Sequence, residues 1–171
     1  KGFPATSTDS LLKEMGIGRQ SLYNAFGDKR QLYMEVLHSY QQMSIGGHLK
    51  RLNEPASPLE GIFELLSGLA AKDRKLRALG CFGVSSIGEF GTSDPELRRL
   101  GEAGGALLRA RIAERIREGQ ALGEIDPGIE AEEGAAFVLV SMMGLQVTAG
   151  AGAGVKDMQQ LAAFAVERLK A

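Results

Sequence analysis

The sequence predicts an all-α protein, with a small helix-turn-helix headpiece at its N-terminus and a larger α-helical domain after it. Apolar residues recur at the three- and four-residue spacing of helices, whereas the period-2 alternation of strands is scarce. The chain has 171 residues, of which 44% are hydrophobic and 24% are charged. This composition is typical of a folded chain with a packed core rather than of a disordered one.

Three helices are expected in the headpiece. Ser7 is a good N-cap for the first of them, which we expect to end at Gly16 because glycine accepts the left-handed conformation found there. A short helix should follow from Arg19 to about Phe26. Asp28 should cap a third helix, which we expect to end near Gly46-Gly47.

A linker with two prolines is expected at Asn53–Pro58, between the headpiece and the rest of the chain. The sequence predicts five helical segments after it, at residues 59–72, 81–90, 95–121, 130–149 and 155–170. The most apolar run, at residues 134–145, is too short for a membrane span and is better explained as a buried helix.

Charge and cysteine content narrow the possible functions. Residues 1–51 carry seven basic and four acidic side chains, a net charge of +3, whereas residues 52–171 have a net charge of −4. The sign fits a headpiece that faces nucleic acid, although alone it is weak evidence. Cys81 is the only cysteine, which excludes an internal disulfide and a zinc site built from cysteines. Nothing in the sequence indicates an oxidising compartment, so we expect the protein in the cytoplasm.

The second helix of the headpiece has one apolar and one polar face. Leu22 and Phe26, four residues apart, should pack inward. Arginine suits guanine, and glutamine or asparagine suits adenine, so a short helix carrying them can read base edges in a major groove. Tyr23 and Lys29 can meet phosphates. The base-facing candidates are Arg19, Gln20, Ser21 and Asn24.

The stretch KEMGIGRQSLYNAFGDKRQLY, at residues 13–33, resembles the headpiece of the tetracycline-repressor (TetR) family. The resemblance implies a homodimer of nine-helix subunits that bind DNA through residues 1–46. It implies a regulatory domain, at residues 58–171, that carries a small-molecule pocket and the dimer contacts. The family's first helix is largely missing before Gly2-Phe3. Gly18 stands where a polar cap is usual, so the recognition helix should fray more at its start.

By position in this resemblance, Thr6 and Ser7 join Arg19, Gln20, Ser21, Tyr23, Asn24 and Lys29 as expected DNA-binding residues. Two of these have a simpler explanation as well. Tyr23 could pack against the headpiece, and Lys29 could be an ordinary surface lysine. Their shared spacing with the other motif residues favours the DNA-binding interpretation.

The segment 130–149 is apolar on nearly all faces, and such a helix needs partners on two sides. One side can be covered by its own chain and the other by a second copy, as the last two helices of the resembled family do. A central core helix in a monomer is the alternative. The expected dimer contacts are Val138, Met142, Leu145, Leu161, Ala165 and Leu169.

The sequence indicates the position of an effector pocket only weakly, because large apolar residues more often pack in the hydrophobic core than line a pocket. The sequence offers Phe63, Cys81, Phe82, Phe90, Met142 and Met143 as lining candidates. It shows no charged or metal-binding constellation, so we expect neither a cofactor nor a metal. His38 and His48 are ten residues apart without a ligand cluster and are interpreted as ordinary histidines.

Cys81 supports two interpretations. It begins a predicted helix just after Arg74, Lys75 and Arg77, and both features stabilise a thiolate that could sense electrophiles or oxidants, as similar family segments do. The favoured interpretation is a small buried residue at a place where the helix passes close to a neighbour. The favoured function is therefore a ligand-responsive repressor, with a thiol sensor as the alternative. A helical adaptor and an enzyme using Cys81 with a histidine are remote alternatives.

Overall fold

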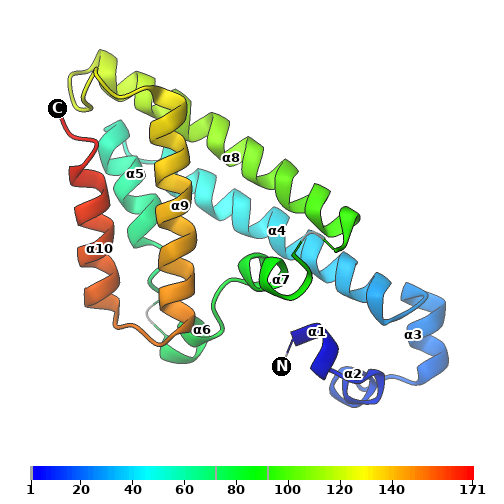
Figure 1. Ribbon diagram of the computed structural model, residues 1–171. Coiled ribbons are helices and arrows are strands. Elements are labelled where there is room, and N and C mark those ends of the chain that lie inside the picture. The colour runs from blue at the N-terminus through cyan, green and yellow to red at the C-terminus, as the bar shows by residue number, and fades with distance from the viewer. Residues whose placement is uncertain (1, 72, 92) are drawn as a thin grey trace.

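The computed structural model describes residues 2–71, 73–91 and 93–171, and in these ranges it contains helices and no β-strand (Figure 1). The predicted all-α class is confirmed. One isolated bridge joins Ile125 to Lys170. The helices are α1 (Gly2–Ala5), α2 (Thr8–Met15), α3 (Arg19–Phe26), α4 (Lys29–Asn53), α5 (Pro58–Ser67), α6 (Arg74–Ala78), α7 (Phe82–Phe90), α8 (Pro95–Ala121), α9 (Ala131–Gly150) and α10 (Val155–Glu167).

The headpiece begins and ends its helices where the local sequence directs. Ser7 caps α2, because its hydroxyl accepts a hydrogen bond from the backbone N–H of Ser10 at 3.1 Å. Gly16 follows α2 in the left-handed conformation, with φ of 66°. Asp28 caps α4 by accepting from the N–H of Gln31 at 2.8 Å. The predicted bounds of α2 and α3 and the cap of α4 are confirmed.

Helix α4 is longer than predicted. It passes through Gly46 and Gly47 and ends at Asn53, so the prediction of an end at the glycine pair is wrong. Each glycine costs a helix about 1 kcal/mol relative to alanine. Burial of Leu37, His48 and Leu52 along the inner face of α4 outweighs that cost. As a result, one helix runs from the headpiece into the rest of the molecule, α5 to α10, which we call the body (Figure 1).

An aromatic cluster and an ion pair are among the contacts that fasten the headpiece to the body. An aromatic cluster brings together Phe3 of α1, Tyr33 of α4 and Phe90 of α7, with ring centroids 5.1–5.5 Å apart. The guanidinium of Arg30 pairs with the carboxylate of Asp94 at 2.8 Å, and this bond lowers the Asp94 pKa. The start of α4 is therefore held against both α7 and α8.

The core of the body lies between α4, α5, α8, α9 and α10. Ile62, Ile112 and Val138 are fully buried there. Helices α4 and α5 approach closely at Gly61, where an added Cβ would overlap the carbonyl oxygen of Leu52. The small residue permits this approach, and the buried aliphatic side chains supply the stabilising apolar contact.

Two features of the body differ from expectation. The short helix α6 forms where only a basic stretch was recognised, because the Asp73 carboxylate accepts from the N–H groups of Lys75 and Leu76. By length and composition alone, α9 would meet the requirement for a membrane span, contrary to the sequence expectation. Its inner face instead packs on α8, α5 and α10.

Candidate functional site

Helix α3 presents a polar face to solvent. Leu22 is fully buried beneath it, whereas the four candidate base-reading side chains on the other side are exposed. Tyr23 keeps 44% of its surface accessible, so it is not packed away inside the headpiece. The geometry therefore leaves free the surface that a major groove would meet. The exposed candidates are Arg19, Gln20, Ser21 and Asn24.

One bond to α2 and one bond within α3 order the polar face of α3. Arg19 pairs with the carboxylate of Asp9 on α2. Gln20 donates its amide hydrogen to the side-chain oxygen of Asn24 at 2.9 Å. Such exposed contacts contribute little to stability, but they hold these donors and acceptors in place on one surface.

The residues flanking α3 have structural bonds of their own. Ser7 caps α2, and the hydroxyl of Thr6 donates to the carbonyl of Gly2 at 2.7 Å. The ammonium of Lys29 donates to the carbonyls of Phe3 and Thr6, both at 2.8 Å, and lies over the Phe3 ring. Lys29 therefore ties the start of α4 to α1, and a phosphate would have to share its hydrogens.

A second exposed surface lies on α9 and α10, which run side by side at one edge of the molecule (Figure 1). Val140 is 68% exposed and Phe164 is 64% exposed, which is unusual for side chains of this size. Together with their apolar neighbours they form what we call the α9–α10 face. Its members are Phe137, Val140, Met143, Val147, Leu161 and Phe164.

The structure changes which residues can contact a second subunit. Of the six dimer contacts expected from the sequence, Leu161 alone lies on the α9–α10 face. The other five point into the core of their own chain, because the inner side of these helices covers α5 and α8. These five are Val138, Met142, Leu145, Ala165 and Leu169.

A partly polar cavity of about 170 Å³ lies between α4, α6 and α9. Its charged and hydrogen-bonding groups come mainly from α4, which contributes four residues along one face. Gln146 on α9, Arg77 on α6 and Cys81 at the start of α7 complete the polar wall. The residues from α4 are Tyr40, Ser44, His48 and Arg51.

Hydrogen bonds fix the tautomer of His48, and burial fixes its protonation state. The Arg51 guanidinium donates to Nδ1 of His48 at 2.7 Å, so Nε2 carries the imidazole hydrogen and can donate to the hydroxyl of Ser44 at 3.0 Å. Burial, followed by the charge of Arg51, lowers the His48 pKa to about 4. Burial is also the main cause that raises the pKa of Tyr40, with its contact to Cys81 second.

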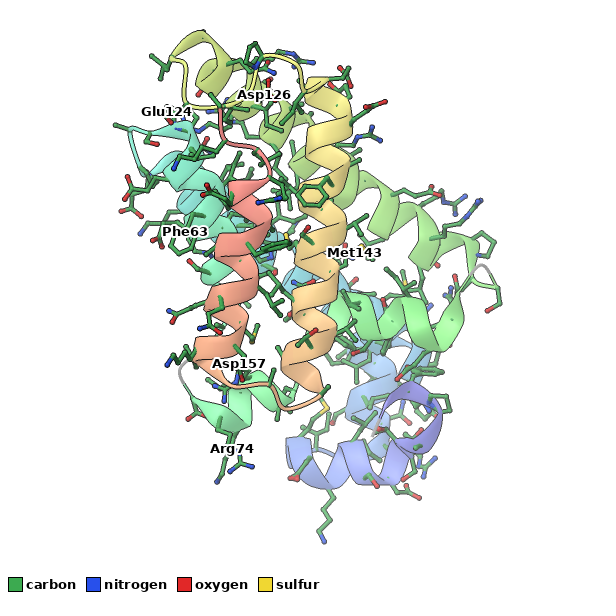
Figure 2. All side chains as sticks on the ribbon, turned by 60° about the vertical axis from the view of Figure 1, so that its left-hand side comes forward. Phe63, Arg74, Glu124, Asp126, Met143 and Asp157 are labelled. Atoms are coloured by element: carbon green, nitrogen blue, oxygen red, sulfur yellow. The ribbon has the colours of Figure 1, made fainter. Side chains whose placement is uncertain are left out.

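The residues expected to line a pocket do not gather in one place. Cys81 does line the cavity, but Phe82 and Phe90 belong to the aromatic cluster at the headpiece. Figure 2 shows Phe63 on α5 and Met143 on α9, well apart. Met142 is buried in the core. A larger apolar hollow of about 440 Å³, which includes Phe82, lies in the headpiece beside α1.

Sequence reasoning missed the cavity residues on α4. Tyr40, Ser44, His48 and Arg51 recur at helical spacing, which places them on one face of a continuous helix. An expected helix end at Gly46-Gly47 separated the first two from the last two and hid the pattern. In the part of the chain that the structure describes, no group of three or more histidine, cysteine or acidic residues could hold a metal ion.

Comparison with protein families decides what this architecture is. Residues 1–36 match the family model of bacterial regulatory proteins of the tetR family. Residues 59–164, more than half of the chain, match the tetracyclin repressor-like C-terminal domain. The chain belongs to the TetR family. The predicted family of DNA-binding transcriptional regulators, rather than of enzymes, is thereby confirmed.

The chain is also similar in sequence to two HTH-type transcriptional regulators. The chain is 36% identical over 102 residues to YezE of Bacillus subtilis, an uncharacterized HTH-type transcriptional regulator; the match covers 59% of this chain and about half, 53%, of YezE. It is 24% identical over 166 residues to the HTH-type transcriptional repressor ComR of Escherichia coli, covering 94% of this chain and 78% of ComR.

Solved TetR structures agree with the fold. CifR, crystallised as a cysteine mutant with a 26 bp operator DNA, has a TM-score of 0.82 and 26% identity, covering 97% of this chain and 87% of CifR. The reduced form of NemR from E. coli has a TM-score of 0.83 at 16% identity, covering 100% and 89%, and shows the fold alone.

Proposed function

We propose that this TetR-family protein is a dimeric transcriptional repressor that binds operator DNA through α3 and releases it when a small molecule occupies the cavity beside α4. The single observation that carries the proposal is the exposed polar face of α3 above buried Leu22. Base edges in a major groove require donors and acceptors on a helix surface, and α3 offers them. A DNA target supports a cytoplasmic location for the protein.

A two-fold dimer provides the spacing that the operator requires. Two recognition helices about 34–36 Å apart reach successive major grooves on one side of the duplex. The α9–α10 face supports such a dimer, because an exposed apolar patch of this kind is stabilised when a second copy covers it. The effector would then act by favouring a subunit arrangement with a different spacing.

The DNA-binding proposal predicts different effects for base and phosphate contacts. We expect Arg19→Ala to relax the preference at one base pair of the operator, with a loss of about 1–3 kcal/mol for the preferred base. Tyr23→Phe should weaken binding to all sequences by a similar factor. The measurement is a gel shift with a duplex selected from a random library and its single-base variants, at fixed salt.

Lys156→Ala is the matched control for this experiment, because it removes a positive charge from the exposed start of α10, in the body. It should leave both affinity and base preference unchanged. If Arg19→Ala and Lys156→Ala bind every duplex as the unaltered protein does, α3 does not read DNA.

Cys81 supports a second candidate function, a repressor whose cavity senses thiol-reactive compounds. The observation that favours it is the position of Cys81 in the cavity wall, half-buried and in contact with Tyr40. We expect diamide to release DNA from the unaltered protein in a gel shift, and Cys81→Ser to abolish that release while retaining DNA binding. Release that persists in Cys81→Ser contradicts this function.

A further inference from the structure

The cavity beside α4 is built to receive negative charge. Its wall holds the guanidinium groups of Arg51 and Arg77, and no carboxylate belongs to the described residues that line it. Arg77 donates to the backbone carbonyls of Ala71 and Ala153 at 2.6 and 2.9 Å. These bonds hold Arg77 in the cavity wall.

The Nε hydrogen of Arg51 has no acceptor among the residues that the structure describes. This nitrogen is buried, whereas a Nη atom of Arg51 donates to His48. A buried donor left unpaired is destabilising. The charge of Glu64 on α5 raises the Arg51 pKa, against the larger lowering by burial. Among the described residues, the two side chains form no ion pair within 4.0 Å. Arg51 therefore carries a positive charge that no ion pair with a carboxylate of the described residues neutralises.

The surroundings of Arg51 are shaped for its side chain. A Cβ atom at Gly68 would overlap Cδ and Nε of Arg51, so glycine leaves the room that the guanidinium stem occupies. His48 accepts from Arg51 and remains neutral at pH 7, so it neither pairs with an anion by charge nor neutralises Arg51. Tyr40 also keeps its proton at pH 7 and can donate from the same wall.

We propose that the cavity binds a small organic anion, a carboxylate carried on a body about the size of one aromatic ring, with the carboxylate held by Arg51. This inference rests on the proposed function, because it names the chemical class of the effector. A cavity of about 150 Å³ is known to hold benzene, and this one measures about 170 Å³. Leu69, Leu76 and Ala149 line the part that the ring would contact.

The charge of the ligand is what the experiment must isolate. Calorimetric titration of the full chain with benzoate, benzamide and benzylammonium compares an anion, a neutral analogue and a cation of similar size. We expect benzoate to bind one per subunit, benzamide to bind at least about tenfold more weakly, and benzylammonium not to bind. Absence of benzoate binding, or equal affinity for benzoate and benzamide, overturns the proposal.

Variants then locate the site. Arg51→Met should lower the benzoate affinity at least about tenfold, and Gly68→Ala should lower it by displacing the Arg51 side chain. Arg51→Lys restores the charge and should recover part of the affinity, which separates loss of charge from misfolding. Lys50→Met is the matched control, because Lys50 is the exposed neighbour of Arg51 on α4. Equal losses in Lys50→Met and Arg51→Met contradict the assignment to Arg51.

Gel shifts with the same protein distinguish failure of the anion site from failure of the proposed repressor function. DNA binding without benzoate binding refutes the anion site and leaves the repressor proposal intact. Benzoate binding that depends on Arg51 without any DNA binding supports the site and refutes the repressor. Release of bound DNA by benzoate, lost in Arg51→Met, supports both.

Discussion

Replacing Phe164 with glutamate is expected to convert the proposed dimer to monomers. Phe164 is a large, exposed residue of the α9–α10 face, so its replacement does not disturb the core of the subunit. In a two-fold dimer the new carboxylate is present twice and lies against apolar side chains of the partner. The cost of burying these two carboxylates, which Arg168 beside position 164 offsets only in part, should weaken the dimer at least about 100-fold. Sedimentation equilibrium measures this change directly.

Loss of the dimer should also lower DNA affinity steeply, because each headpiece then binds its half-site alone. Met43→Glu is the matched control: Met43 is an exposed apolar residue on α4, away from the α9–α10 face, and its replacement should leave the protein dimeric. A Phe164→Glu protein that remains dimeric at low micromolar concentration contradicts the proposed interface.

Acidification from pH 7 to pH 4 is expected to reduce the unfolding free energy by about 3 kcal/mol through His48 alone. The His48 pKa is lowered to about 4 in the folded protein, whereas a histidine in the unfolded chain titrates near 6.5. Between these values the unfolded chain binds a proton that the folded protein excludes. Stability therefore falls as the pH falls through this window and is unaffected by His48 above it.

Urea denaturation at several pH values measures the effect, and His48→Gln isolates it. The variant retains hydrogen-bonding groups but cannot titrate, so its stability should depend less on pH between 7 and 4. His38→Gln replaces the exposed histidine on the same helix and should retain the full loss. Parallel pH profiles for the unaltered protein and His48→Gln are incompatible with a buried, neutral His48.

Local signals in the sequence were sufficient for the headpiece. The caps at Ser7 and Asp28 and the left-handed Gly16 each follow from the chemistry of one residue and its neighbours. The same reasoning failed at Gly46-Gly47, because the buried residues that keep α4 helical pack on elements far away in the chain. Helix propensity is a weak determinant where tertiary packing decides.

The orientation of α9 could not be predicted for a related reason. A helix that is apolar on nearly all sides has no pattern that distinguishes the face toward its own core from the face toward a partner. Packing against α5, α8 and α10 makes that choice, burying Val138 and leaving Val140 exposed two residues later. The cavity was equally hidden, since its wall combines α4, α6 and α9 from distant parts of the sequence.

Because α4 is continuous, it can act as a stiff arm between the cavity and the headpiece. Its 25 residues span about 37 Å at the α-helical rise of 1.5 Å per residue. One end carries His48 and Arg51, and the other carries Lys29 beside the headpiece. A tilt of a few degrees at the cavity end therefore becomes a displacement of several ångströms where α3 would meet DNA. The glycine pair Gly46-Gly47, which lies closer to Asn53 than to Lys29, is the place where this arm bends most easily.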